Sequence, residues 1–264
     1  MQAKNVLYDK SDGVGTITLN RHAKSNALNY DIMDELWALL QDIIVDDDVR
    51  VVVLTAAGKY FSAGADMEVL TTLATSSLAT IRRQIRTCWQ RIFNEFEDMQ
   101  KLTIAAVNGS AIGGGVELAL SCDLRYSVDD ATFSLPEVNF GIIPEVGGVT
   151  RLPWLIGLAK AKELILSGES IGAKEAEELG LVNKIFPRET FKEEVRKLAL
   201  KFAQKPPLAL GIGKQLINRS FQLRDAKFSL EDAIDVQSIL IHTEDYQEAV
   251  AALKEKRAPI FRGR

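Results

Sequence analysis

Cysteine and histidine are scarce in this sequence. Its 264 residues include two cysteines, Cys88 and Cys122, and two histidines, His22 and His242. Two cysteines cannot build a disulfide framework or a four-cysteine metal site, and two histidines exclude a histidine-rich metal site. Neither cysteine has a histidine near it in the sequence, so a thiolate nucleophile is not indicated. Catalytic chemistry would therefore have to come from other side chains or from the backbone.

Long apolar runs and an excess of positive charge are also missing. No run reaches the roughly 18 apolar residues of a membrane span, and the amino terminus has no apolar stretch of signal-peptide length. The formal net charge of -4 produces a global field that repels nucleic acid. With 47% hydrophobic and 26% charged residues, the composition predicts a folded, soluble and cytoplasmic protein.

Neither of the two common nucleotide-binding motifs is present. The triplet Gly113–Gly115 lacks the G-x-G-x-x-G spacing of a dinucleotide site. The segment Gly211-Ile212-Gly213-Lys214 lacks the spacing and the hydroxyl residue of a P-loop. The glycine-rich segments therefore require another explanation.

Predicted strands and helices alternate along the first half of the chain. Asp12-Gly13 is typical of a hairpin turn, and Asn29 is a capping residue before apolar residues at helical spacing. This alternation predicts an α/β fold with ligand-binding groups on loops at strand ends. The expected strands are residues 6–8, 14–19, 51–55 and 103–107, and the expected helices include one after Asn29 and one over residues 77–99.

The second half of the chain is predicted to be mainly helical. Helices are expected over residues 159–166, 173–179 and 189–204, and Pro206-Pro207 then marks the best internal boundary. Two further amphipathic stretches and a basic tail, Lys254–Arg264, follow. We interpret this end as a separate helical subdomain or as an oligomer contact.

Three consecutive glycines stand at one of two strand-to-loop junctions. The first junction covers residues 60–66, and the second covers residues 108–115, where Gly113–Gly115 precede a helix start at Val116. Glycine lets a ligand approach the backbone, and free N–H groups at a helix start attract developing negative charge. The pattern is typical of an oxyanion hole, with a flexible turn or a close packing point as the alternative.

Three glutamates occur in apolar stretches of the sequence. Glu117 falls in the first helical turn after the glycines, and Glu137 and Glu145 lie between Leu135 and Gly148. An apolar setting raises the pKa of a carboxyl group and suits it to acid/base catalysis near neutral pH. The alternatives are a helix-dipole role for Glu117 and solvent-exposed loop charges for the other two.

Taken together, these segments resemble the linked signatures of the enoyl-CoA hydratase/isomerase (crotonase) family. The matching segments are residues 61–66, residues 113–119, and Pro136-Glu137 with Gly147-Gly148. The likeness continues through Leu152-Pro153, residues 173–176, residues 180–183 and Lys256-Arg257, and so covers nearly the whole chain.

The resemblance implies a fold and an assembly. The expected fold is an α/β crotonase-like spiral of ββα units with a carboxyl-terminal helical oligomerisation region. We expect the spiral core with the active site in residues 1–200 and the oligomerisation region in residues 201–264. A homotrimer, often paired into a hexamer, is the expected assembly.

The resemblance also implies a binding site for an acyl-CoA thioester. The backbone N–H groups of Ala65 and Gly114 are expected to bind the thioester oxygen. The CoA part of the substrate is expected near Ala63 and the backbone of Asn26, Ala27 and Leu28, with Asp66 and Gly113 also in the substrate-binding set. Coenzyme A is then part of the substrate, and no metal or redox cofactor is implied.

The activity implied is reversible syn hydration of a trans-2-enoyl-CoA. In hydratases of the family, glutamates match both Glu117 and Glu137. By resemblance, Glu117 activates the water and Glu137 delivers the proton to the α-carbon. The neighbouring Glu68 stands where hydratases often have a lysine associated with CoA, so phosphate contacts would come from other residues such as Lys24 or the tail.

Glu145 leaves an alternative activity open. Many hydratases resemble Ile-Pro-Gly at this place, whereas some isomerases and specialised hydratases carry an acid there. The chain is therefore also interpreted as an enoyl-CoA or dienoyl-CoA isomerase that uses Glu137 and Glu145, or as a hydratase that recognises a polar acyl group. A weaker alternative is a non-catalytic RNA-binding or assembly subunit, against which the acidic pI and the intact Glu117 and Glu137 argue.

Overall fold

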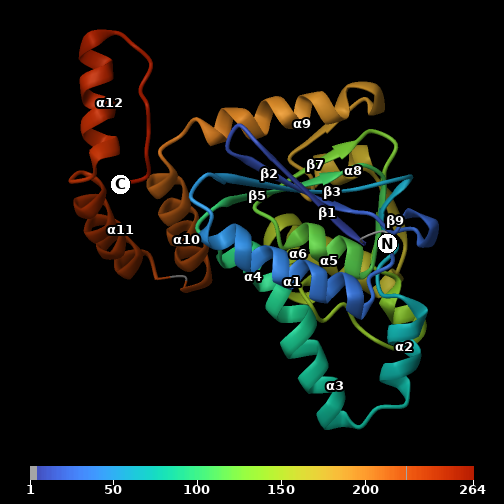
Figure 1. Ribbon diagram of the computed structural model, residues 1–264. Coiled ribbons are helices and arrows are strands. Elements are labelled where there is room, and N and C mark those ends of the chain that lie inside the picture. The colour runs from blue at the N-terminus through green and yellow to red at the C-terminus, as the bar shows by residue number, and fades with distance from the viewer. Residues whose placement is uncertain (1–4, 224) are drawn as a thin grey trace.

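Two β-sheets form the centre of the protein (Figure 1). The computed structural model describes residues 5–223 and 225–264. The larger sheet has six strands in the order β1-β2-β3-β5-β7-β10, and the smaller has four in the order β4-β6-β8-β9. The strands are β1 (Val6–Ser11), β2 (Val14–Leu19), β3 (Val51–Ala56), β4 (Tyr60–Ser62), β5 (Leu102–Val107), β6 (Ser110–Ile112), β7 (Leu124–Val128), β8 (Thr132–Ser134), β9 (Ser170–Gly172) and β10 (Lys184–Phe186).

Helices cover both faces of the larger sheet. Figure 1 shows α9 on one face and α1, α4 and α5 on the other. The helical elements are η1 (His22–Lys24), α1 (Tyr30–Val45), α2 (Met67–Ala74), α3 (Leu78–Gln84), the π-helical segment η2 (Ile85–Gln90), α4 (Arg91–Asp98), α5 (Gly114–Leu120), η3 (Pro136–Phe140), α6 (Gly148–Ile156), α7 (Leu158–Ser167), α8 (Ala173–Glu178), α9 (Arg188–Ala203), α10 (Pro207–Leu223), α11 (Ala226–Leu240) and α12 (Glu244–Glu255).

Local sequence explains why these elements form. The side chain of Asn29 accepts a hydrogen bond from the Ile32 amide and so caps α1, as predicted. The apolar stripe of α1 is buried through Leu36 and Leu40, and truncating either to alanine would cost roughly 2–5 kcal/mol of stability. β3 and β5 are apolar except for Thr55 and Thr103, because helices cover both of their faces.

Successive strand pairs alternate between the two sheets. β3, β5 and β7 lie in the larger sheet, and β4, β6 and β8, which follow them in the chain, lie in the smaller sheet. Both sets pair in parallel, so their carboxyl ends point to the same side of the molecule. The predicted spiral of ββα units is confirmed. Its consequence is that the loops after β4 and β6 end beside each other.

Two expectations about the helices need correction. Residues 77–99 do not form one regular α-helix, because η2 separates α3 from α4 with π-helical geometry. The segment after Pro207 holds three helices rather than two amphipathic stretches. The sequence around the break between α10 and α11 contains neither glycine nor proline, so the local sequence signal for a helix end is weak there.

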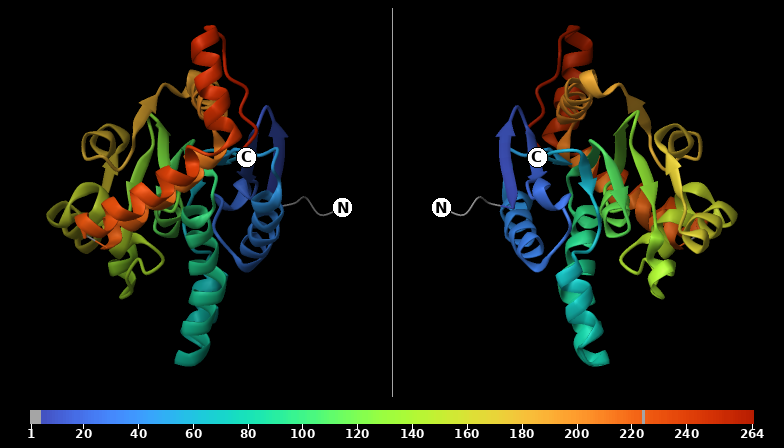
Figure 2. Two further views of the ribbon diagram at one scale, coloured as in Figure 1. Left: turned by 90° about the vertical axis from the view of Figure 1, so that its left-hand side faces the viewer. Right: turned by 90° about the vertical axis from the view of Figure 1, so that its right-hand side faces the viewer.

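The carboxyl-terminal helices α10, α11 and α12 lie to one side of the sheets, at the left of Figure 1, and they face the viewer in the left view of Figure 2. Residues 200 and 201, where the sequence suggested a division, both lie within α9, and the loop between α9 and α10 is residues 204–206. The functional division between core and oligomerisation region stays a prediction. Among residues 5–223 and 225–264, no helix is long and apolar enough to cross a membrane.

Candidate active site

The loops after β4 and β6 bring two backbone amides together. A methyl carbon placed on Gly114 would lie 3.7 Å from the Ala65 nitrogen, and one placed on Gly64 would lie 3.2 Å from the Gly114 nitrogen. The β4–β6 register, which pairs Ser62 with Ala111, holds the loops at this separation. Within the described parts of the chain, neither the Ala65 nor the Gly114 amide donates a hydrogen bond to protein. Both are open to a ligand oxygen.

Gly113 fixes the start of α5 and the space beside it. Its φ of 51° lies in the left-handed region, and its amide donates to the Ser134 carbonyl at 2.8 Å. A methyl group on Gly113 would lie 2.5 Å from Oε1 of Glu137. A side chain at this position would displace that carboxyl group, so glycine is required here on two grounds.

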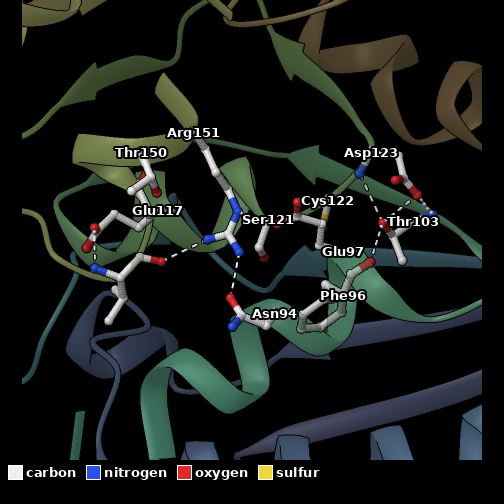
Figure 3. Close-up of polar contacts among 12 residues, drawn as sticks. Asn94, Phe96, Glu97, Thr103, Glu117, Ser121, Cys122, Asp123, Thr150 and Arg151 are labelled. Atoms are coloured by element: carbon white, nitrogen blue, oxygen red, sulfur yellow. Dashed lines mark hydrogen bonds and ion pairs between the residues drawn. The ribbon is translucent and has the colours of Figure 1, made fainter. Parts of the chain in front are cut away.

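Glu117 is buried on the first turn of α5 and is held by a second loop. Its side chain is 2% exposed, and its Oε1 accepts hydrogen bonds from the Val146 amide at 2.9 Å and the Gly148 amide at 2.8 Å. Figure 3 shows the first of these two contacts. The pKa of Glu117 is raised from 4.5 to about 8, mainly by burial. The charges of Glu145 and Glu137 contribute to the rise, and the two amide hydrogen bonds oppose it.

Glu137 stands on η3 beside the same space. Its Oε2 is buried and has no hydrogen-bond partner among the residues that the structure describes. Burial raises the pKa of this carboxyl to about 6, with a smaller contribution from the charge of Glu145. A buried carboxyl oxygen without a protein partner is available to a ligand or to a water molecule.

Glu145 is the third carboxyl group at this place. Burial raises its pKa. Its main-chain carbonyl accepts a hydrogen bond from Nε2 of Gln90 at 3.4 Å, which links the loop to η2. No ion pair involving its carboxylate occurs within the part of the chain described. Three glutamates therefore face one space without a cation paired to any of them.

This space is a cavity of about 520 Å³. Its wall contains Lys24 and many apolar side chains in addition to the open amides and the carboxyl groups. Nine of the eleven predicted site residues line it: Ala27, Ala63, Ala65, Asp66, Gly113, Gly114, Glu117, Glu137 and Glu145. The structure brings these residues together, while their roles in binding and catalysis stay predictions.

Asn26 and Leu28 do not line the cavity. Asn26 is fully buried, and its Nδ2 donates to the carbonyls of Ala57 and Tyr60, both at 2.8 Å. Leu28 is also buried, and its backbone bonds to Gly64 and Asp66 on the neighbouring loop. Leu28 therefore holds the 63–66 loop in place and Asn26 holds the preceding strand β4, and the side chains of both contact protein rather than the cavity.

Sequence reasoning missed part of the cavity wall. Leu70, Leu73, Ile85 and Trp89 line it from α2 and η2. Trp89 lies in the segment predicted as a helix over residues 77–99, and an apolar helical pattern does not distinguish a core position from a cavity wall. The amides of Val146 and Gly148 were also missed, although Gly147-Gly148 had been noted as part of a motif.

A metal centre is not formed by the described residues. Within residues 5–223 and 225–264, no three histidine, cysteine, aspartate or glutamate side chains are placed to hold a metal ion. Neither cysteine lines the cavity, and burial raises the pKa of Cys88 to about 11 and that of Cys122 to about 12. Both thiols are therefore poor nucleophiles at neutral pH.

Known proteins resemble this chain over nearly all of its length. The family described as Enoyl-CoA hydratase/isomerase matches residues 9–264. The chain is 38% identical over 259 residues to the short-chain-enoyl-CoA hydratase of Clostridium acetobutylicum, with 97% of each chain covered. It is 37% identical over 260 residues to the 2,3-dehydroadipyl-CoA hydratase of Escherichia coli, with 98% of this chain and 99% of the other covered.

Solved structures also resemble this protein over nearly all of its length. The enoyl-CoA hydratase from Bacillus anthracis superimposes with a TM-score of 0.92 and 37% sequence identity. The match covers 98% of this chain and 100% of the other.

Proposed function

Because this chain belongs to the enoyl-CoA hydratase/isomerase family, we propose that it adds water reversibly to the double bond of a trans-2-enoyl-CoA. The observation that carries the proposal is the cavity itself. Two unpartnered amides and two carboxyl groups of raised pKa, on Glu117 and Glu137, line the same cavity. Hydration of an enoyl thioester needs both kinds of group.

The amides of Ala65 and Gly114 would bind the thioester oxygen. When water adds to the β-carbon, electrons move through the double bond to this oxygen, which gains negative charge as an enolate. Gly114 is the first residue of α5, so the positive end of the helix dipole adds to the attraction. Loss of one such donor costs about 2.7–4 kcal/mol of transition-state stabilisation.

The two glutamates would move the protons. In hydration, Glu117 takes a proton from the water as its oxygen adds to the β-carbon, and Glu137 gives a proton to the α-carbon. The two carboxyl groups together therefore carry one proton both before and after the reaction. With pKa values of about 8 and about 6, the pair holds that proton on Glu117 near neutral pH, which is the starting state for dehydration. Hydration begins once the proton has moved to Glu137.

The rest of the cavity wall suits an acyl-CoA. Leu70, Leu73 and Ile85 offer apolar contacts to the acyl chain, and Lys24 supplies a positive charge for a phosphate group of CoA. The backbone near Ala27 and Ala63 would hold the remainder of the CoA moiety. No metal or redox cofactor has a role in this scheme, because the two amides stabilise the enolate charge.

Glu145 favours a second candidate activity. A third carboxyl in the same cavity provides a second proton carrier beside Glu137. Such a pair could move a proton between two carbons of a 3-enoyl-CoA or a dienoyl-CoA without adding water. We prefer hydration because Glu117 is held by two amides in the same cavity, and Glu145 then influences which acyl group is accepted.

The two activities are separated by three variants and two assays. Glu117→Gln and Glu137→Gln should each lower kcat for hydration of crotonyl-CoA by roughly 10²-fold or more, the scale of lost acid/base catalysis, while Glu145→Gln mainly changes substrate choice. Glu189→Gln, which alters an exposed glutamate on α9 outside the cavity, is the matched control. Full activity of Glu117→Gln together with loss of double-bond migration in Glu145→Gln would identify an isomerase instead.

We further propose that the protein forms homotrimers or hexamers in the cytoplasm. The support is a set of exposed apolar side chains on the carboxyl-terminal helices: Ile217 and Phe221 on α10, and Leu230, Ile234 and Ile239 on α11. Exposed apolar groups in such number are typical of a subunit interface. Light scattering coupled to gel filtration would measure the assembly, and a monomer at micromolar concentration would refute it.

A further inference from the structure

Arg151 lies on α6 behind the loop that holds Glu117. Its side chain is 11% exposed and does not line the substrate cavity. Nε donates to Oε2 of Glu97 at 2.7 Å, and Nη2 donates to Oδ1 of Asn94 at 2.8 Å (Figure 3). Both partners belong to α4, so the guanidinium group is fixed in one orientation by two side chains of a neighbouring helix.

The third contact of Arg151 reaches the loop itself. Nη1 donates to the carbonyl of Val146 at 2.9 Å, and the amide of the same residue donates to Glu117. The Arg151 amide also donates to the Gly147 carbonyl at 2.7 Å. A methyl carbon on Gly147 would lie 2.6 Å from Nη1, so the guanidinium packs directly on this turn. The turn between Val146 and Gly148 is thus held on one side by Arg151 and offers its amides to Glu117 on the other.

We propose that Arg151 is a positioning residue for catalysis, which aims the Val146 and Gly148 amides at Glu117 and so fixes the carboxyl group relative to the substrate. This inference rests on the proposed hydratase function. Arg151 acts through geometry rather than through its charge, because Glu97 neutralises it and the charges that act on Glu117 are those of Glu145 and Glu137. Charge-assisted hydrogen bonds of this kind are short and directional, as positioning requires.

The first test is Arg151→Gln in the full-length protein, assayed for hydration of crotonyl-CoA. We expect kcat to fall about 10–100-fold, by analogy with the loss of a residue that orients a metal ligand, while KM changes by less than about threefold. Arg188→Gln is the matched control, because Arg188 also binds a carboxylate and a backbone carbonyl, those of Asp130 and Asn108, away from the cavity. It should keep the native kcat.

The second test combines Arg151→Gln with Glu117→Gln. If Arg151 works by placing Glu117, its removal should have no further effect on the residual kcat once Glu117 has become glutamine. An equal fold-loss in both backgrounds, or native kcat in a folded Arg151→Gln, would overturn the inference. Should Arg151→Gln fail to fold, Asn94→Ala removes one of the contacts that orient Arg151 and should give a smaller loss of kcat with the same dependence on Glu117. Inactivity of the native protein toward every enoyl-CoA would instead refute the proposed function.

Discussion

Replacing Glu117 by glutamine should abolish the loss of stability that the native protein undergoes as the pH rises, while removing most of its hydratase activity. The carboxyl group is 2% exposed and its pKa is raised from 4.5 to about 8, mainly by burial. The folded protein therefore holds a proton that the unfolded chain releases. The stability that this proton contributes is fully present below about pH 4.5 and is lost as the pH rises through about 8.

The size of the effect follows from the shift in pKa. Each unit of pKa difference corresponds to about 1.4 kcal/mol, so native stability should fall by roughly 3–4 kcal/mol between about pH 5 and about pH 8 relative to the glutamine variant. Glutamine has a side-chain oxygen that can still accept from the Val146 and Gly148 amides. Any cost of burying its NH2 group is independent of pH, so the slope of the difference is the quantity to measure.

The assay is urea unfolding of the two proteins across this pH range, with the subunit concentration held constant. Glu137→Gln serves as the comparison, because the pKa of Glu137 is raised only to about 6. The difference in unfolding free energy between this variant and the native protein should therefore stop growing above about pH 6. Glu137 and Glu145 are the charged groups that act on Glu117, and both stay in place in Glu117→Gln. A stability difference that does not change with pH, or that grows in favour of the native protein, would refute the reasoning.

Three further outcomes are expected. The kcat/KM of hydration should be bell-shaped in pH, with limbs near 6 and near 8, because one proton must be shared by Glu117 and Glu137; a profile flat from about pH 5 to 9 would contradict this. Gly114→Pro should abolish turnover of crotonyl-CoA while circular dichroism shows a folded protein, because proline is tolerated at the first position of a helix but has no N–H for the thioester oxygen. Treatment with a chelator should leave activity unchanged. A loss of activity that a divalent cation reverses would show that catalysis needs a metal ion, which the proposed site does not include.

Local chemistry made much of the architecture predictable. The hairpin at Asp12-Gly13, the cap at Asn29 and the apolar run of β3 depend on residues adjacent in the sequence, and the structure confirms all three. The glycines at the start of α5 also indicated a helix end with open amides. Apolar periodicity did not predict the π-helical segment η2 or the break before α11, because neither change in helix geometry is marked by a glycine or proline.

Only the tertiary structure decided how these parts meet. Ala65 and Gly114 are 49 positions apart in the chain, and their amides adjoin because β4 and β6 pair in parallel. The pKa of Glu117 depends on burial and on the amides of Val146 and Gly148, 29 and 31 residues further along the chain. The sequence by itself determined which residue types were available for acid/base and oxyanion chemistry. Their distances, burial and shared cavity arise from sheet register and helix packing, because these contacts join residues that no local pattern connects.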